Sequence, residues 1–174
     1  LDLSEIRTTV HLGAHADAPS HYTPGGEGID RRPLERYYGP CEVFDVRHLP
    51  AGSRVRPQDL PAAPRATRVL LRTGSFPDPC RFDTGFSALS PELVDWLADR
   101  GAVLVGLDTP SVDLFADKAL LSHHAIARRD LAILEGLVLD GVAPGIYTLI
   151  ALPLRLVGAD ASPVRAALIA ENPA

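Results

Sequence analysis

The segment 11–21 concentrates side chains that bind metals or transfer protons. In an extended chain, residues two apart point to the same face. Gly13 leaves room for an ion between neighbouring imidazoles because it has no side chain. Imidazole and carboxylate together suit Zn²⁺ or another divalent transition metal, so the pattern predicts a metal site, the alternative being a polar turn with chance histidines. The four side chains all occupy odd positions and are His11, His15, Asp17 and His21.

Further candidates lie later in the chain, around Glu135 and the pair His123 and His124. Glu135 stands between Leu134 and the apolar run that begins at Leu137. An acid in such a setting is costly unless it is paired or bound to metal. The alternative for Glu135 is a solvent-facing turn.

Length and composition limit the class of protein. A chain of 174 residues fits one domain, 1–174, with a sizeable core. The net charge of −5, without a run of Lys or Arg, argues against a nucleic-acid surface. No apolar run is long enough to span a membrane. Cys41 and Cys80 do not make a disulfide framework, so we expect free thiols in the cytoplasm.

The elements that must position these residues are few helices and several strands. A helix is predicted from Pro91, with Ser90 as its N-cap and Gly101 as its stop. The apolar run 102–107 predicts a buried strand, and polar residues after such a strand often line a site. The long loop 75–89 is of a length that is often functional. Further strands are expected at 8–10, 41–46, 67–73, 147–157 and 164–169.

The last two expected strands, 147–157 and 164–169, are typical of an antiparallel sheet. The alternation of helix and strand is too sparse for a doubly wound fold. We therefore expect an α+β fold with mixed sheets and few helices.

Taken together, these motifs resemble the metal-dependent cyclase superfamily. The carrier of the resemblance is the pattern His-x-Gly-x-His-x-Asp-x-Pro-x-His over 11–21, although the family usually has Thr where this chain has Ala14. Other segments are similar to the bacterial kynurenine formamidases (arylformamidases) of that superfamily. These segments are 38–41, 106–113, 132–137, 149–154 and 160–165.

The resemblance implies a swivelling β/β/α fold, a homodimer and a binuclear zinc site. By position, His11, His15 and Asp17 would hold one metal, and Asp17 would bridge to the second. The family's interval to Glu135, the other bridging ligand, selects His123 over His124 as the ligand of the second metal. The family also carries an N-terminal segment, with an aromatic residue that packs on the substrate, which this sequence lacks.

The resemblance further implies zinc-dependent hydrolysis of N-formyl-L-kynurenine to L-kynurenine and formate, with His21 as general acid/base. The alternatives for His21 are a third ligand or a hydrogen-bond partner of a ligand. A serine triad is discounted because the chain has no G-x-S-x-G motif. Alternatives for the whole protein are a related hydrolase of a cyclic amide such as isatin, often with Mn²⁺, and a non-catalytic metal-binding module. Candidates for contact with an aryl formamide substrate are Tyr22, Ser111 and Phe115.

Overall fold

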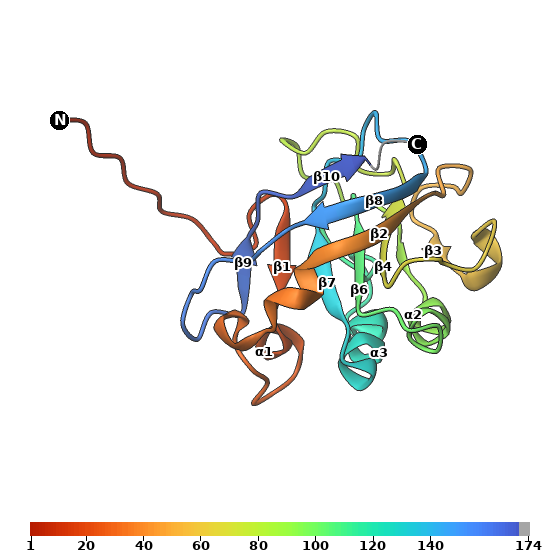
Figure 1. Cartoon of the computed structure of the whole chain (residues 1–174), viewed down its shortest axis with the longest axis horizontal. Helices are drawn as coiled ribbons and strands as arrows, with labels where there is room; N and C mark the ends of the chain where they lie inside the picture. Colours follow the sequence, from red (N-terminus) through yellow and green to blue (C-terminus); the bar gives the residue numbers. More distant parts are fainter. Residues whose placement is uncertain (171–174) are drawn as a thin grey trace.

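Four parallel strands, β2, β4, β6 and β7, form the centre of an eight-stranded sheet (Figure 1). This computed structural model describes residues 1–170. Antiparallel strands complete the sheet on both sides, in the order β10-β8-β2-β4-β6-β7-β1-β9. The expected α+β fold with a mixed sheet and few helices is confirmed. The strands are β1 (His15–Asp17), β2 (Tyr38–Asp45), β3 (Arg54–Val55), β4 (Arg68–Arg72), β5 (Ala88–Leu89), β6 (Leu104–Leu107), β7 (Ala132–Glu135), β8 (Gly145–Ile150), β9 (Ala161–Pro163) and β10 (Ala167–Ala170).

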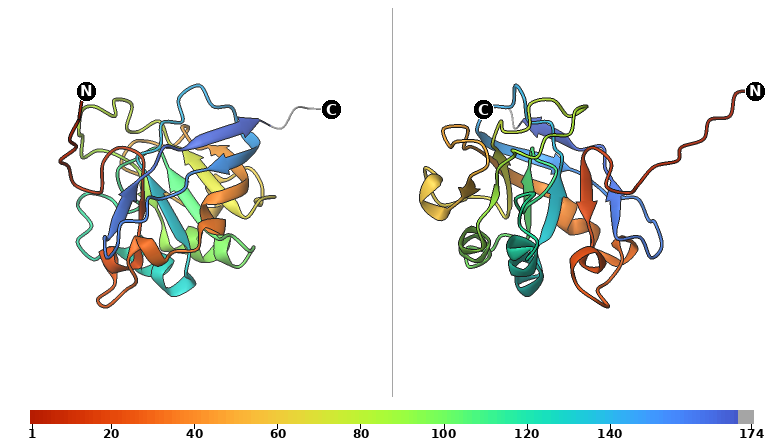
Figure 2. Two further views of the ribbon diagram at one scale, coloured as in Figure 1. Left: turned by 60° about the vertical axis from the view of Figure 1, so that its left-hand side comes forward. Right: turned by 180° about the vertical axis from the view of Figure 1, so that it is seen from behind.

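Three α-helices accompany the sheet: α1 (Pro19–Tyr22), α2 (Pro91–Ala98) and α3 (Leu121–Arg129). The predicted helix start is confirmed, since the Ser90 side chain accepts a hydrogen bond from the Leu93 backbone N–H at 3.1 Å. Helix α3 connects β6 to β7 and packs beside α2 (Figure 2). Because β6 and β7 are parallel, the carboxyl ends of both strands lie at the same edge of the sheet.

Apolar side chains fill both faces of the curled sheet. In β4, Val69 and Leu71 pack with the α2 and α3 side chains, whereas Leu70 faces the opposite side. That opposite side forms a second core, over which β8 and β2 cross in front of β7 and β6 (Figure 1). Strands buried on both faces read as continuous apolar runs, which is why 67–73 and 102–107 were recognisable as strands.

Three expected strands differ in the structure, and in one of them, 164–169, only residues 167–169 are strand. Residues 8–10 form no strand, because the first segment with partners on both sides is β1, which lies between β7 and β9. The expected strand 147–157 ends at Ile150, where the pairing with β2 and β10 stops. The chain then forms a loop and returns as β9, which pairs with β1. The apolar run of β8 continues into the following loop. The pattern of apolar residues therefore does not show where the strand ends.

Within residues 1–170, no helix has the length and apolar character needed to cross a membrane. Both cysteines are free, Cys41 in the core and Cys80 exposed on the loop after β4.

Candidate metal centre and its cavity

Strand pairing places three of the predicted ligands together. His15 and Glu135 are direct partners in the antiparallel pair of β1 and β7, so their Cβ atoms lie close on the same face. Asp17 lies two residues further along β1 and faces the same side. All three are buried, with exposed fractions of 3%, 3% and 1% for His15, Glu135 and Asp17. Glu135 therefore does not point to solvent, the alternative left open by the sequence.

Helix α3 supplies the fourth residue, His123, which is 2% exposed. The Asp113 carboxylate accepts hydrogen bonds from the backbone N–H groups of Ser122 and His123, at 2.9 and 3.0 Å, and so caps the helix. Asp113 also accepts a hydrogen bond from His123 Nδ1 at 2.9 Å. One carboxylate thus fixes both the start of α3 and the orientation of the imidazole. His124, its neighbour, is exposed and lies outside the cluster.

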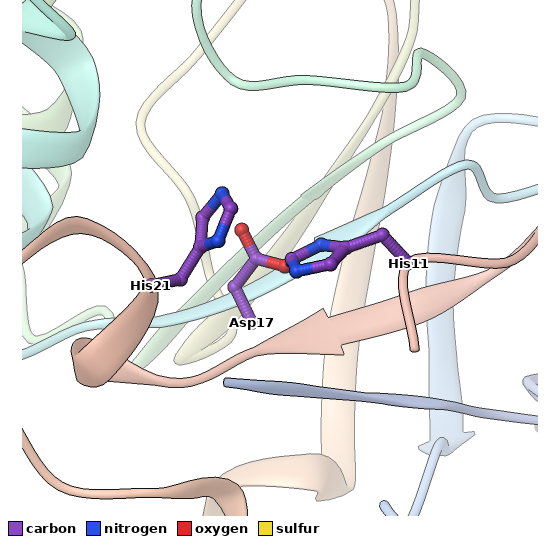
Figure 3. Close-up of side chains that lie close together, drawn as sticks. All are labelled: His11, Asp17 and His21. Atoms are coloured by element: carbon purple, nitrogen blue, oxygen red, sulfur yellow. The ribbon is translucent and has the colours of Figure 1, made fainter. Parts of the chain in front are cut away.

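His11 and His21 complete the cluster from outside the strand (Figure 3). Their rings lie 4.2 Å apart between centroids, on the open side of Asp17. The expected extended register is wrong for these two residues. Gly13 has φ +57°, which turns the chain before β1, and Pro19 starts α1 after it. His11 and His21 consequently reach Asp17 by a turn and by a helix, while only His15 and Asp17 keep the strand alternation.

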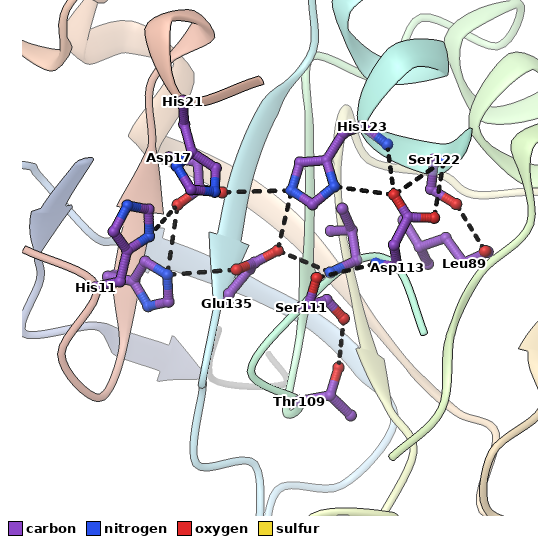
Figure 4. Close-up of polar contacts among 12 residues, drawn as sticks. His11, Asp17, His21, Leu89, Thr109, Ser111, Asp113, Ser122, His123 and Glu135 are labelled. Carbon is purple, nitrogen blue, oxygen red and sulfur yellow. Dashed lines mark hydrogen bonds and ion pairs between the residues drawn. The ribbon is translucent and has the colours of Figure 1, made fainter. Parts of the chain in front are cut away.

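The two buried carboxylates each divide their oxygens between two groups of histidines (Figure 4). Asp17 Oδ1 lies 3.1 Å from His11 Nδ1 and 3.4 Å from His15 Nε2, and Glu135 Oε2 lies 3.3 Å from the same His15 atom. The other oxygens face His123 Nε2, which is 3.6 Å from Asp17 Oδ2 and 3.7 Å from Glu135 Oε1. Each carboxylate therefore has one oxygen near His15 and the other near His123.

Each of these three imidazoles is held by its outer nitrogen. His15 Nδ1 donates to the Gly13 carbonyl oxygen at 2.9 Å, as His123 Nδ1 does to Asp113. His11 Nε2 donates to Asp160 Oδ2 at 3.1 Å. These hydrogen bonds hold each ring by its outer nitrogen and turn the inner nitrogen toward the buried carboxylates. Metal-binding histidines are oriented in the same way.

The inner atoms of the cluster lack hydrogen-bond partners. Among the described residues, His15 Nε2, His123 Nε2 and both Asp17 carboxylate oxygens are buried and unsatisfied. Buried polar groups are normally paired, so these atoms fit a cation that binds nitrogen and oxygen.

The pKa values of the buried histidines and of Glu135 also indicate that the cluster attracts positive charge. Burial would lower the pKa of His15, but the neighbouring Asp17 and Glu135 carboxylates raise that pKa to about 10. The pKa of His123 is likewise raised to about 10, against its burial, by Asp113 and Asp17. Burial and the nearby Asp17 charge raise the pKa of Glu135. Two buried carboxylates thus attract positive charge into one place, which is what a divalent cation would provide.

The cluster opens into a cavity of about 760 Å³ at the carboxyl edge of the parallel strands. Ser111 lines the cavity. Tyr22 is buried and packs its ring 5.2 Å from the His123 ring, so it supports that residue from behind. Phe115 lies outside this cavity and contacts Phe82, which does line it. The predicted functional loop 75–89 forms much of the wall, through Phe76, Pro77, Pro79, Cys80 and Phe82.

Sequence reasoning did not assign a role to Asp113 or Asp160. Asp113 belongs to the polar stretch after the buried strand 102–107, and this position could have indicated that it lies near the site. Asp160 belongs to the family-like segment 160–165, but no spacing linked it to His11, which lies 149 residues away along the chain.

A contact between two glycines sets the position of His15. A Cβ atom at Gly136 would lie 2.3 Å from the Gly13 carbonyl oxygen, the acceptor of the His15 hydrogen bond, and Gly136 has φ +63°. We expect Gly136→Ala to lower the free energy of unfolding by about 3 kcal/mol or more, through backbone strain plus overpacking. Gly141→Ala is the matched control, since Gly141 has φ +74° but open space around it, and about 1 kcal/mol is expected there. Equal losses in urea unfolding would show that the glycine contact is unimportant.

Comparison with known proteins identifies relatives of this chain. The Cyclase family model matches residues 3–114. A kynurenine formamidase from Bordetella petrii is 50% identical over 170 residues, which cover 97% of this chain and 80% of that protein. The kynurenine formamidase from Maricaulis maris is 47% identical over 171 residues, with the same coverage.

Solved structures show the same fold. One described as a potential metal-dependent hydrolase with cyclase activity has a TM-score of 0.84 and 32% identity, covering 94% of this chain and 81% of that one. Isatin hydrolase A from Labrenzia aggregata has a TM-score of 0.77 and 24% identity, covering 96% and 76%. The chain belongs to the cyclase family and, within it, to the kynurenine formamidases.

Proposed function

We propose that this protein is a metal-dependent hydrolase that converts N-formyl-L-kynurenine to L-kynurenine and formate. The observation that carries the proposal is the pair of buried carboxylates, Asp17 and Glu135, each divided between two histidine groups at the end of an open cavity. Membership of the kynurenine formamidases supports the substrate. A structural metal would need a closed site, so the opening into a cavity argues against a non-catalytic module.

We propose two divalent ions per chain. His11 and His15 would hold one, His123 would hold the other, and Asp17 and Glu135 would contribute one oxygen to each. Imidazole and carboxylate ligands favour Zn²⁺, with Mn²⁺ as the alternative. When bound, such ions lower the pKa of water and polarise a carbonyl oxygen.

The chain's own contribution to the reaction is proton transfer and orientation. His21 lies over the cluster and remains accessible, with 36% of its side chain exposed. Asp160 Oδ2 accepts a hydrogen bond from His21 Nδ1 at 3.3 Å, which leaves Nε2 to carry a proton. Hydrolysis forms a bond from water oxygen to the formyl carbon and breaks the bond from that carbon to the aryl nitrogen. His21 Nε2 would deliver the proton that the leaving aryl amine requires.

The cavity fits an aryl formamide. Phe76 and Phe82 pack edge to face at 6.3 Å and offer an aromatic wall to the kynurenine ring.

We also propose that two copies associate into a homodimer, which the family resemblance supports. Large apolar side chains that stand exposed near the end of the described chain are Leu152, Leu154, Val157 and Ile169.

The test is an absorbance assay of formylkynurenine hydrolysis on protein that has been stripped of metal and then titrated with zinc or manganese. Activity is expected to return with metal and to reach its maximum near two ions per chain by elemental analysis. Isatin is the comparison substrate, and we expect slower turnover on it. Faster turnover of isatin would overturn the assignment, and activity that survives complete metal removal would overturn the metal-dependent mechanism.

A further inference from the structure

The cavity has a second polar end, away from the histidines. Charged side chains that the proposed chemistry does not use also line the cavity: Arg47, Arg72, Asp108 and Asp140. Arg72 ends β4, Arg47 and Asp108 come shortly after β2 and β6, and Asp140 lies in the loop after β7. The parallel arrangement therefore brings them to the same edge of the sheet as Glu135.

Some of this charge is already committed to contacts within the fold. The Asp108 carboxylate accepts hydrogen bonds from the backbone N–H groups of Thr73 and Gly74, at 2.9 and 2.8 Å, and from the Thr73 hydroxyl at 2.6 Å. Asp108 thus anchors the turn after β4 and has little capacity left for a ligand. Asp45, just outside the cavity, accepts hydrogen bonds from the Arg47 guanidinium.

Each arginine has N–H donors left beyond its ion pair, which joins Arg47 to Asp45 and Arg72 to Asp140. Arg47 has 49% of its side chain exposed, and its stem lies across Gly74, where a Cβ atom would be 2.9 Å from Arg47 Cγ. A glycine at that position lets the arginine lie across the turn after β4. Arg72 is mostly buried and donates to the Val142 carbonyl oxygen at 3.2 Å. Its other partner, Asp140, is 93% exposed and pairs with Arg72 alone among the described residues.

The spacing suits one end of an amino acid. Arg72 and Gly74 follow β4, which lies two strands from β7 and Glu135, or about 10 Å at the usual spacing between strands. In formylkynurenine, six bonds join the formyl carbon to the α-carbon, which sets an upper limit of roughly 9 Å at about 1.5 Å per bond. A hydrogen bond of about 3 Å then closes the distance to a guanidinium.

We propose that Arg47 and Arg72 bind the α-carboxylate of the substrate and that Asp140 binds its α-ammonium group. The proposal rests on the proposed function, and it adds that the enzyme selects an aryl formamide with a zwitterionic amino-acid end. Arginine suits this task because its planar donors match a carboxylate. The aromatic wall between the two polar ends holds the ring, so that the metal cluster receives the formamide.

Three substrates separate the contributions of each group. N-formyl-L-kynurenine carries both charges, 4-(2-formamidophenyl)-4-oxobutanoate carries only the carboxylate, and 2′-formamidoacetophenone carries neither. We expect Arg47→Gln and Arg72→Gln to lower kcat/KM roughly ten- to one-hundredfold on the first two substrates, the size expected for a charge-assisted hydrogen bond. The loss should lie mainly in KM, and turnover of 2′-formamidoacetophenone should not change. Asp140→Asn should affect only formylkynurenine.

The control is Arg65→Gln, which removes an arginine paired with Glu42 at the opposite end of β4, outside the cavity. This variant should match the wild type on all three substrates. The acetophenone rate also reports whether each variant is folded. Equal losses on all three substrates, or no loss on any, would overturn the proposed amino-acid site. A wild-type enzyme that cleaves the acetophenone but not formylkynurenine would overturn the proposed function instead.

Discussion

Asp17→Ala is expected to abolish both metal retention and hydrolysis. Asp17 is 1% exposed, and its two oxygens face different histidines, Oδ1 toward His11 and His15 and Oδ2 toward His123. If it bridges two ions, its removal takes a ligand from each of them. The loss in kcat/KM should therefore exceed the 10- to 100-fold that is typical when a hydrogen-bond partner of a ligand is removed.

Two further variants define the result. His15→Ala should also lose metal and activity, although less severely than Asp17→Ala. The reason is that His15 Nε2 faces only one of the two proposed metal positions. Asp108→Asn is the matched control, since it alters a buried aspartate of the same cavity that bonds only to the turn after β4. We expect Asp108→Asn to lose stability but to keep its metal. Normal metal content in Asp17→Ala, measured by elemental analysis, would exclude the bridging role.

His21→Ala is expected to retain the fold and both metals but to lose turnover. General acid/base groups contribute about 10²–10⁴-fold, so kcat on the formamide should fall by that order. His21 bonds to Asp160 rather than to a buried carboxylate of the cluster, and more than a third of its side chain is exposed. Both features favour a proton carrier over a ligand, although the ring lies close enough to Asp17 to bind an ion.

An activated aryl formate ester tests which proton His21 transfers. A phenolate leaving group hardly needs protonation, so the ester should lose much less activity than the amide does. Equal losses on both substrates would assign His21 to the attacking water or to substrate binding. A variant that arrives stripped of metal would make His21 a ligand. His124→Ala, an exposed histidine outside the cluster, is the control and should behave as the wild type.

Much of the fold could be predicted from local patterns. The helix at Pro91 was recognisable because its cap, its first proline and its apolar stripe all lie within a few residues of one another. The central strands were recognisable because burial on both faces demands continuous apolar runs. Strand ends were harder, since the run after Ile150 is as apolar as the strand itself and only the absence of a partner ends it.

By itself, the sequence determined the family, the mixed sheet and the chemical character of segment 11–21. Residue types and short spacings carry this information, because ligand chemistry depends on which atoms are present. Only the tertiary structure decided how the residues meet. The pairing of His15 with Glu135 depends on the register of two strands that lie far apart in the chain. Likewise, Asp113 and Asp160 reach their histidines through contacts that no local pattern encodes. Hydrogen bonds across such separations arise when distant segments pack, and the orientation of each imidazole therefore follows from the fold.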